Sequence, residues 1–519
     1  MLICLIGCLY LQAQSTDKIR CYFNTPANTT LSTSSPATYL TTFFPDTIAA
    51  YINRAKYTID MAMYNYTASA GSNVAKIATA INAAATRGVR VRWLYNGTNA
   101  TNNTGISLLN AQVNLFPSAN LSNYIMHNKF MVIDVLSADS TDAIIQTGSF
   151  NFSDAQTTGD VNNIVFVQSK QVALAYYNEF NKMWGGSAAA PNAAAATFST
   201  SKTASAQTSF MVDGKAIEVY FCPKDNVASR LTTSIQTAQK DLFFGVYTFT
   251  DNNIANAIKN KYQNGVRARG IMDENSLIYN AYATLNPVMG VDLMINSGSD
   301  LYHDKVMLVD ATDPTSDPQV FTGSYNWTNQ GQNSNDENVM VIHDAKTANQ
   351  YYQVMCANFT TLGGAACMGM PCPSNTNTIV SNLKATGSYQ WQVNTGTGFS
   401  NIANSSIYSG ATSAYLTLTN APTNWYGYQY RCMINNSSYS DTTTLKFTCY
   451  WNGQVSNNWH LAANWNCNVL PDANTDVIIN NGVKFFPQIN QNTSCRSVML
   501  NKGAQAQLAA SAQLLLTGQ

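Results

Sequence analysis

Two parts of the first 360 residues resemble each other in sequence and in order. The segment His127–Asp134 (HNKFMVID) matches His303–Asp310 (HDKVMLVD), and Gly148–Asn151 (GSFN) matches Gly323–Asn326 (GSYN). Two earlier pairs of segments match in the same order, and the four offsets are 183, 177, 176 and 175 residues. A repeat of this length indicates a duplicated folding unit. We therefore expect two similar halves, with equivalent motifs meeting at a pseudo-twofold axis.

Each half alternates segments that are typical of helices and of strands. Asn73–Ala85 has the 3.6-residue period of an amphipathic helix, and Gly88 follows it where a capping glycine is expected. Val89–Tyr95 then alternates like a strand, and closing helices are predicted at Val172–Trp184 and Ala345–Phe359. Strands that alternate with helices predict an α/β fold for this part of the chain.

Composition sets the expected domain boundaries. We expect the first half to span residues 15–184 and the second half residues 208–362, joined by a connector over 185–207 that is rich in Ala, Ser and Thr. From residue 372 the chain becomes rich in Asn, Ser, Thr and Tyr, which predicts all-β modules over 372–448 and 449–519. The predicted fold class is an α/β domain followed by C-terminal all-β modules.

The most specific pattern is His-x-Lys-x-x-x-x-Asp followed by Gly-Ser-x-Asn, which occurs once in each half. On a strand, residues i and i+2 share a face, so the histidine and the lysine of each motif are expected to point the same way. The same spacing places the serine and the asparagine of each follower on one face. The side chains concerned are His127, Lys129, Ser149 and Asn151 in the first half and His303, Lys305, Ser324 and Asn326 in the second.

This set of side chains suits the chemistry of a phosphodiester. Phosphoryl transfer develops negative charge on non-bridging oxygens, which two ammonium groups with amide and hydroxyl donors can hold. One histidine can attack phosphorus in line, while the other protonates the leaving oxygen and then deprotonates water. A carboxylate bound to the imidazole would hold its tautomer. Regular strand spacing turns Asp134 and Asp310 away, so the residues alone leave that carboxylate unassigned.

The duplicated motif resembles the two HKD motifs of the phospholipase D superfamily, over roughly residues 19–360. The resemblance implies a duplicated mixed sheet flanked by helices, one active site between the halves, a covalent phosphohistidine and no metal. By analogy the N-terminal histidine is the nucleophile and the second histidine the acid. The implied catalytic residues are His127, Lys129, Asp134, His303, Lys305 and Asp310, and the implied phosphate-binding residues are Ser149, Asn151, Ser324 and Asn326.

One acidic residue after the second motif has no acidic counterpart after the first. Glu337 lies in the sequence Asp336-Glu337-Asn338, which resembles the family pattern, and we expect it to support the catalytic residues from behind. The aligned residue in the first half is Asn162, with Asp160 nearby. An acidic residue in this role is therefore expected on one side only.

The N-terminus predicts export. Leu2–Leu11 is an apolar run too short to span a bilayer, so residues 1–14 are expected to be a signal peptide and the protein to be secreted or held at the cell surface. The alternatives are lipid attachment at Cys8 and a buried N-terminal strand. No later stretch has the length and apolarity of a transmembrane segment.

Cysteine spacing agrees with an oxidising compartment. Nine cysteines follow the predicted signal peptide, and seven of them lie after residue 355, where most disulfides are expected. Cys372 is a candidate partner for Cys432. No His or Cys cluster has the spacing of a zinc site, so no metal or other cofactor is expected.

The C-terminal third resembles two kinds of β module. Trp391, followed by Tyr430 two residues before Cys432, resembles the strand tryptophan and tyrosine corner of an immunoglobulin-like sandwich. The segment from Cys449 resembles a β-rich repeat of Bacteroidetes surface proteins, and it stops at Gln519 within strand-like sequence, as a truncated module would. Contact with a cell surface or a polymer is one expectation for these modules, and plain spacing is the other.

Charge guides the choice of substrate. The chain has 28 Lys+Arg and 28 Asp+Glu, and residues 1–360 hold 22 against 25, a net charge of −3. A nuclease needs cations along the path of the strand, so we expect a phospholipid or another small diester. The alternatives are a secreted endonuclease, which would take nucleic acid, and a surface-binding protein whose catalytic region is inactive.

Overall fold

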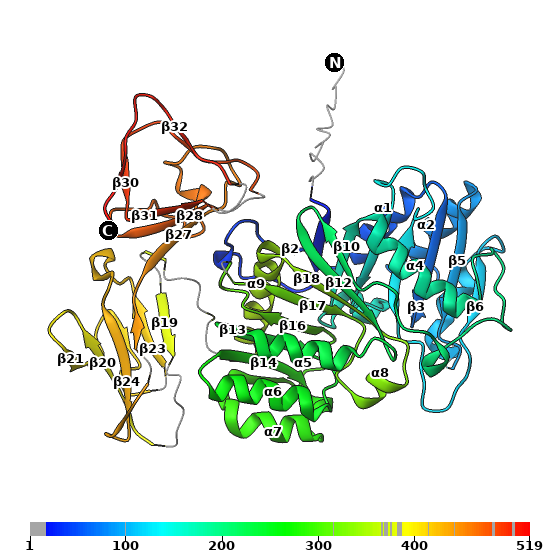
Figure 1. Ribbon diagram of the computed structural model, residues 1–519, viewed down its shortest axis with the longest axis horizontal. Coiled ribbons are helices and arrows are strands. Elements are labelled where there is room, and N and C mark those ends of the chain that lie inside the picture. The colour runs from blue at the N-terminus through cyan, green and yellow to red at the C-terminus, as the bar shows by residue number, and fades with distance from the viewer. Residues whose placement is uncertain are drawn as a thin grey trace, which may run out of the picture.

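Two eight-stranded sheets with flanking helices, followed by several small sheets, make up the computed structural model of the protein (Figure 1). The predicted signal peptide at residues 1–14 lies outside the described part of the chain. The structure describes residues 17–98, 100–314, 316–364, 367, 372–373, 376–380, 387–413, 415–440, 442–479, 483–500 and 504–518.

The first sheet combines antiparallel and parallel pairs. Its central strand β3 pairs in parallel with β5 and antiparallel with β7, so the sheet is mixed. In spatial order the strands are β2 (Thr38–Tyr39), β1 (Ile19–Phe23), β10 (Asn163–Gln168), β8 (Ile144–Gly148), β7 (Lys129–Ile133), β3 (Thr58–Met63), β5 (Arg90–Tyr95) and β6 (Asn114–Pro117).

The second sheet repeats this arrangement. β13 pairs in parallel with β14 and antiparallel with β16, as β3 does with β5 and β7. The order is β11 (Ser209–Val212), β12 (Lys215–Phe221), β18 (Asn338–His343), β17 (Gln319–Gly323), β16 (Lys305–Val309), β13 (Asp241–Val246), β14 (Arg267–Asp273) and β15 (Leu293–Asn296). The duplication and the α/β class expected from the repeat are therefore confirmed.

The helices lie close to where the periodicity predicts them. The predicted helices at Asn73–Ala85, Val172–Trp184 and Ala345–Phe359 correspond to α2, α4 and α9, and Gly88 has the positive φ of a capping glycine. No helix in the described part of the chain is long and apolar enough to cross a bilayer. The helices are α1 (Phe44–Asn53), α2 (Ala75–Thr86), α3 (Asp154–Thr158), α4 (Lys170–Trp184), α5 (Val227–Thr237), α6 (Asn252–Gln263), α7 (Asn280–Met289), α8 (Asn329–Asn333) and α9 (Ala345–Thr361).

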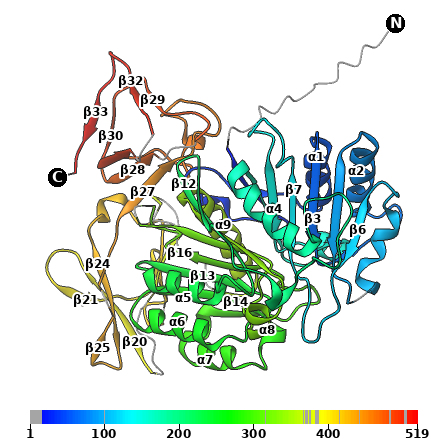
Figure 2. The ribbon, with the colours of Figure 1, turned by 45° about the vertical axis from the view of Figure 1, so that its right-hand side comes forward.

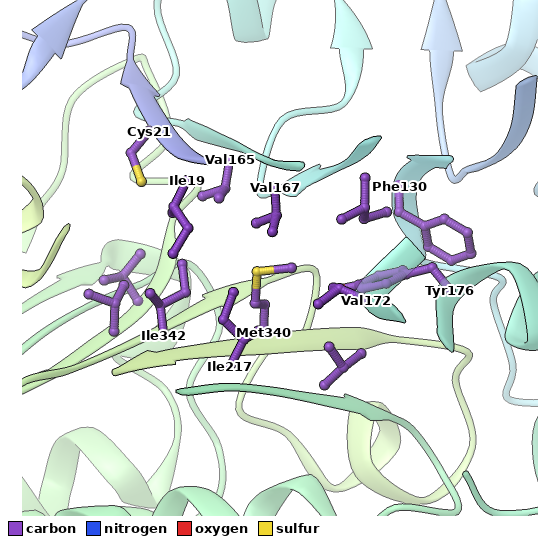
Figure 3. Close-up of a cluster of buried hydrophobic side chains, with 14 of the residues drawn as sticks. Ile19, Cys21, Phe130, Val165, Val167, Val172, Tyr176, Ile217, Met340 and Ile342 are labelled. Atoms are coloured by element: carbon purple, nitrogen blue, oxygen red, sulfur yellow. The ribbon is translucent and has the colours of Figure 1, made fainter. Parts of the chain in front are cut away.

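Each sheet has an outer and an inner face. α1 and α2 cover the outer face of the first sheet, and α5, α6 and α7 cover that of the second, in agreement between the two views (Figures 1 and 2). The inner faces share one hydrophobic core with α4 and α9. In this core Val165 and Val167 of β10 face Ile217 of β12 and Met340 and Ile342 of β18 (Figure 3). Because both halves contribute to one core, their relative position is fixed by apolar burial.

The connector between the halves packs against the protein. Lys202 is buried, and its ammonium forms ion pairs with Glu179 of α4 and, at 2.7 Å, with Asp336 next to β18. The carboxylate of Asp336 also accepts a hydrogen bond from the Tyr124 hydroxyl at 2.6 Å. The connector therefore ties α4 to the chain segment just before β18.

Two small sheets follow the α/β domain, beside its second half (Figures 1 and 2). Trp391 on β20 is buried opposite Cys432 on β24, in a core that both sheets share. One sheet is β19 (Thr376–Val380), β23 (Tyr415–Thr419) and β22 (Tyr408–Ser409); the other is β21 (Phe399–Asn401), β20 (Tyr389–Asn394), β24 (Gln429–Ile434), β25 (Ser438–Tyr439) and β26 (Thr443–Thr444).

The last part of the described chain consists of short parallel pairs. Trp451, Trp459 and Trp465 pack ring against ring in its core. The pairs are formed by β27 (Phe447–Trp451), β28 (Thr475–Ile479) and β31 (Ser497–Leu500), by β29 (Gln488–Ile489) with β32 (Gln507–Leu508), and by β30 (Thr493–Cys495) with β33 (Leu514–Leu516). The predicted all-β character of the C-terminal third is confirmed.

The disulfides differ from the predicted pairing. Cys356 bonds to Cys367, and Cys372 bonds to Cys467. The prediction of Cys372 with Cys432 is wrong, because Cys372 packs into the core of the last module whereas Cys432 is buried beside Trp391 as a free thiol. Both disulfides use cysteines after residue 355, as expected.

Candidate active site

The motif residues of the two halves meet at one end of the two sheets. His127 and His303 lie just before β7 and β16, and Lys129 and Lys305 are the first residues of those strands. The backbone joins the halves here, because the His127 N–H donates to the Asp336 carbonyl at 2.9 Å. The predicted single site between two halves is therefore present as a cluster of side chains.

The glycines of the Gly-Ser-x-Asn segments are needed for close packing between neighbouring strands within each sheet. Gly148 and Gly323 end β8 and β17 with φ of 144° and 147°. A Cβ atom on either would collide with a backbone carbonyl of the next strand, that of Asn163 or Asn338. Only glycine allows both the conformation and the close contact.

His127 is held by a carboxylate from the other half. Its Nδ1 lies 2.8 Å and 3.0 Å from the two carboxylate oxygens of Glu337. The Ser324 hydroxyl donates to the same carboxylate at 2.6 Å, and the Asn335 amide donates at 3.2 Å. This contact fixes Nδ1–H on His127 and leaves Nε2 with its lone pair.

His303 has an amide in the equivalent place. Its Nδ1 lies 3.0 Å from Oδ1 of Asn162, and the Ser149 hydroxyl lies 3.1 Å from the same oxygen. The two histidines therefore have the same hydrogen-bond geometry but differ in charge: Glu337 bears a carboxylate where Asn162 is neutral. The expectation of an acidic residue on one side only is confirmed, with the added finding that each partner comes from the opposite half.

The two motif lysines are buried and bent toward their histidines. The Lys129 ammonium donates to the backbone carbonyl of His127 at 3.0 Å, and the Lys305 ammonium donates to that of His303. The same ammonium groups lie 5.1 Å from the Tyr64 ring centre and 5.0 Å from the Tyr247 ring centre. A desolvated ammonium over an aromatic ring is stabilised by the ring quadrupole.

Burial dominates the electrostatics of the cluster. It lowers the pKa of His127 to about 4, against the opposing effect of Glu337, and it also lowers the pKa of His303 well below its usual value, helped by Lys305 and Lys129. Burial likewise lowers the pKa of Lys305 to about 7 and that of Lys129 well below its usual range. A buried phosphate anion would reverse these shifts, because it favours every cationic form.

The serine and the asparagine of each Gly-Ser-x-Asn segment have different roles. The Ser324 hydroxyl donates its hydrogen to Glu337, and the Ser149 hydroxyl can donate its single hydrogen to Asn162 or to Asp304. Both serines thus contact groups around the histidines, where the resemblance implied direct phosphate binding. By contrast, Asn151 and Asn326 each keep an amide oxygen without a hydrogen-bond partner among the described residues. A free amide oxygen is an acceptor, so only the NH2 group of each asparagine could donate to a phosphate oxygen.

Asp134 and Asp310 do not join the cluster, which corrects their assignment to the catalytic group. The Asp134 carboxylate accepts hydrogen bonds from the backbone N–H groups of Lys56, Tyr57 and Thr58, at 2.7 to 2.9 Å. Asp310 binds the chain before β13 in the same way. Each aspartate follows the last residue of its motif strand, at the end opposite to the histidine. Its carboxylate holds the first residues of the neighbouring strand.

Three residues near the histidines escaped the sequence reasoning. Tyr64 and Tyr247 pack against the rings of His127 and His303, with centroid distances of 4.7 Å and 5.1 Å. Tyr64 and Tyr247 are the last residues of two matching segments of the repeat, Ala55–Tyr64 and Ala238–Tyr247. Their equivalent positions could have identified them from the sequence. Asp304, between His303 and Lys305, is buried and accepts a hydrogen bond from Ser149 at 2.8 Å. No local pattern marks it.

Within the described ranges, no group of three or more His, Cys, Asp or Glu side chains is arranged to hold a metal ion. The polar groups of the cluster are two imidazoles, two ammonium groups, amides and carboxylates. This donor set matches a phosphate anion better than a divalent cation.

Comparisons with known proteins place the chain in a family. The family model described as "Cardiolipin synthase, PLD-like domain" matches residues 48–184 and 231–357, just over half of the chain, and a domain of unknown function (DUF8693) matches residues 450–519. A phospholipase D of Rickettsia prowazekii is 26% identical over 147 residues, which are 28% of this chain and 68% of that protein. A mitochondrial cardiolipin hydrolase of Xenopus tropicalis is 32% identical over 137 residues, 25% of this chain and 62% of that protein.

Solved structures were compared as well. The phosphatidylserine synthase of Haemophilus influenzae aligns with a TM-score of 0.44 and 14% identity over 62% of this chain and 83% of that chain. Nuc of Salmonella typhimurium, a phospholipase D family member, aligns with a TM-score of 0.24 and 22% identity over 29% and 94%. On the match of the family model to both halves, the chain belongs to the phospholipase D-like family that includes cardiolipin synthase, and it is an enzyme of the phosphodiesterase class.

Proposed function

We propose that this protein is an exported phospholipase D-type enzyme that hydrolyses phospholipid head-group diesters through a covalent phosphohistidine on His127. The observation that carries the proposal is the charge difference between two otherwise equivalent histidines. His127 Nδ1 is bound by the Glu337 carboxylate, whereas His303 Nδ1 is bound by the Asn162 amide. Nucleophilic attack leaves a positive charge on the phosphorylated imidazole, which a carboxylate stabilises and an amide does not.

The first step would form the covalent intermediate. Nε2 of His127 attacks phosphorus, the new P–N bond forms, and the bond from phosphorus to the leaving oxygen breaks. His303, protonated at Nε2 and close to the same phosphate, gives its proton to that oxygen. Lys129 and Lys305 hold the non-bridging oxygens, and the side-chain NH2 groups of Asn151 and Asn326 would serve as further donors.

The second step would reverse these roles. His303, now neutral, takes a proton from water, whose oxygen attacks phosphorus as the P–N bond breaks. The products are a phosphate monoester and free His127. The substrate anion raises the pKa of both histidines. His303 can therefore carry the proton that it donates once the phosphate is bound, although burial lowers its pKa in the empty site.

Charge and relatives support a lipid substrate. Residues 1–360 carry 22 Lys+Arg and 25 Asp+Glu, a net charge of −3, which suits a small diester better than the long anionic path of a nucleic acid. Two of the similar proteins are named as a phospholipase D and a cardiolipin hydrolase. A secreted endonuclease remains the alternative outcome of the experiment below.

Export and surface contact also belong to the proposal. The apolar N-terminal run and the two disulfides are consistent with an oxidising compartment outside the cytoplasm. The two small sheets around buried Trp391 support an immunoglobulin-like sandwich, although the Tyr430 hydroxyl lies 3.1 Å from the Tyr408 hydroxyl and not against an upstream backbone group. We propose that this module and the following β module of Bacteroidetes surface type hold the enzyme at a cell surface.

The experiment compares two substrates in one assay. Purified protein is incubated with phosphatidylcholine vesicles and, separately, with plasmid DNA, each with and without EDTA. The proposal expects released choline, intact plasmid and no effect of EDTA. Cleaved plasmid with intact lipid would establish the endonuclease, and loss of all activity with EDTA would contradict a metal-free mechanism.

Two variants test the assignment itself. His127→Ala removes the proposed nucleophile and should abolish hydrolysis, whereas His460→Ala changes a histidine of the last module, far along the chain from the site, and should leave it intact. Full activity in His127→Ala would refute the catalytic assignment. Inactivity of the wild-type protein on both substrates would favour a binding protein with an inactive catalytic region.

A further inference from the structure

Asp304 is a buried carboxylate beside the second catalytic motif. It lies between His303 and Lys305 and is 3% exposed. Its Oδ1 accepts hydrogen bonds from the Ser149 hydroxyl at 2.8 Å and from the Asn163 amide at 2.7 Å. A buried carboxylate needs such partners, because an unpaired charge in the interior is strongly disfavoured.

A short series of polar contacts joins Asp304 to His303. The Ser149 hydroxyl that lies 2.8 Å from Asp304 also lies 3.1 Å from Oδ1 of Asn162. That oxygen lies 3.0 Å from Nδ1 of His303. Ser149 has one hydrogen and can donate it to either oxygen. The carboxylate is therefore placed two contacts beyond the amide that holds the histidine.

The two catalytic histidines have their nearby carboxylate at different positions. For His127, the residue between the histidine and the lysine is Asn128, whose amide faces the sulfur of Met183, and the partner of the histidine is the carboxylate of Glu337. For His303, the residue between the histidine and the lysine is Asp304, and the partner of the histidine is the neutral Asn162. Each catalytic histidine thus has a carboxylate within reach, in direct contact for one and through Ser149 for the other.

Asp304 is also next to the cation of its own motif. Burial raises the pKa of Asp304 to about 6, opposed by the hydrogen bonds from Asn163 and Ser149 and by the charge of Lys305. Of the charges that favour the ammonium form of Lys305 against burial, Asp304 has the largest effect.

We propose that Asp304 is a positioning residue that replaces the carboxylate missing at Asn162: through its hydrogen bond with Ser149 it places a negative charge behind the amide that holds His303, beside the phosphate site. This inference rests on the proposed phosphodiesterase function. It also explains why the Asn162 amide can serve His303 where His127 uses Glu337.

The fall of kcat/KM at alkaline pH reports the effect of Asp304 on the phosphate site. Loss of the Lys305 proton removes a positive charge from the phosphate site, so its titration contributes to the fall of activity on the alkaline side. The charged groups that act on Lys305 are Asp304, Glu337, Asp160, Asp273, Lys129, His127 and His303, and the titratable Tyr247 has its ring centre 5.0 Å from the ammonium. Removing Asp304 withdraws the strongest of the attractive charges, and the remaining groups are unchanged in the variant.

The test measures kcat/KM for bis(p-nitrophenyl) phosphate against pH in the full-length protein. Asp304→Asn should move the alkaline limb of this profile, where kcat/KM falls as the pH rises, to lower pH by about one unit. Asp241→Asn is the matched control, because Asp241 is a buried carboxylate at the far end of β13 that pairs with Arg267, and its loss should leave the limb in place. If Asp304→Asn does not fold, Asp304→Ala removes the same charge without adding an amide.

A double variant tests the exchange of positions. Asn162→Asp combined with Asp304→Asn gives the surroundings of His303 the charge pattern found around His127, and it should return the limb toward the wild-type pH. An Asp304→Asn enzyme that is slower at every pH with an unmoved limb would show a merely structural role and overturn the inference. A double variant whose kcat/KM falls at the same alkaline pH as that of Asp304→Asn would overturn the claim that Asp304 replaces a carboxylate at position 162.

A binding measurement separates this inference from the proposed function. If the wild-type protein does not hydrolyse the diester, the proposed function fails, and binding of orthovanadate is followed by calorimetry against pH in the same proteins. The inference still expects the alkaline limit of binding to be lower in Asp304→Asn than in wild type. An identical limit in both proteins would overturn it.

Discussion

Replacing Glu337 by Gln isolates the charge that distinguishes the two histidines. The natural His303–Asn162 contact shows that an amide can accept the Nδ1–H at 3.0 Å, so the variant keeps this geometry for His127. The variant loses the negative charge of the carboxylate that lies 2.8 Å from Nδ1 of His127. A hydrogen bond to a charged group contributes about 2 kcal/mol more than a neutral one in a buried site. If that difference acts only on the charged intermediate, formation of the phosphohistidine slows about 30-fold.

The assay is a rapid-mixing measurement of the nitrophenolate burst from bis(p-nitrophenyl) phosphate. This leaving group needs little protonation, so the burst reports the attack by His127 and is insensitive to His303. Glu337 raises the pKa of His127 against burial, so its loss should also move the acid limb of the profile, near pH 4 in wild type, to lower pH. An unchanged burst rate in a folded Glu337→Gln protein, or an acid limb that moves upward, would refute the reasoning.

Three further predictions follow from the electrostatics and the covalent structure. The wild-type kcat/KM should fall above about pH 7, because burial lowers the pKa of Lys305 to about 7 and its deprotonation removes a phosphate-binding charge; a pH–rate profile checks this. Asp134→Asn should lower the free energy of unfolding by about 1–3 kcal/mol through weaker bonds to three N–H groups, with unchanged turnover per folded molecule; urea denaturation with parallel rate assays checks both. Cys372→Ser should destabilise the C-terminal modules by about 4 kcal/mol, since it opens a disulfide with a sequence separation of 95, whereas Cys432→Ser leaves both disulfides intact; calorimetry distinguishes the two.

The duplicated motif was sufficient to predict the site because it combines local and long-range information. Spacing within each motif predicts which side chains share a face, and the repetition predicts that two such faces meet. The structure confirms the meeting of His127 and His303 with their lysines, since the two sheets have the same strand order. The inference did not require knowledge of how the sheets pack.

The partners of the histidines could be predicted only in part. The alignment of the halves paired Glu337 with Asn162 and so predicted an unequal support, but it could not show that each residue binds the histidine of the opposite half. That arrangement depends on the shared core between β10 and β18. Asp304 was missed because a single polar residue within a strand motif gives no periodic signal.

The remaining errors have a common physical origin. Asp134 and Asp310 are part of the family motif by sequence, yet their carboxylates bind backbone N–H groups of a neighbouring strand, a role that sequence spacing does not separate from catalysis. The partner of Cys372 was misassigned because disulfide pairing follows from the packing of the modules. Both cases depend on contacts between segments far apart in the sequence.

Trapping the covalent intermediate tests the central claim most directly. In His303→Ala the base for the second step is missing, and bis(p-nitrophenyl) phosphate still reacts because its leaving group needs no acid. After mixing and rapid denaturation at alkaline pH, where phosphohistidine is preserved, peptide mass spectrometry should find a nitrophenyl phosphoryl group on His127. The same adduct should be absent from His127→Ala. A burst of nitrophenolate with no adduct on His127 would contradict the account.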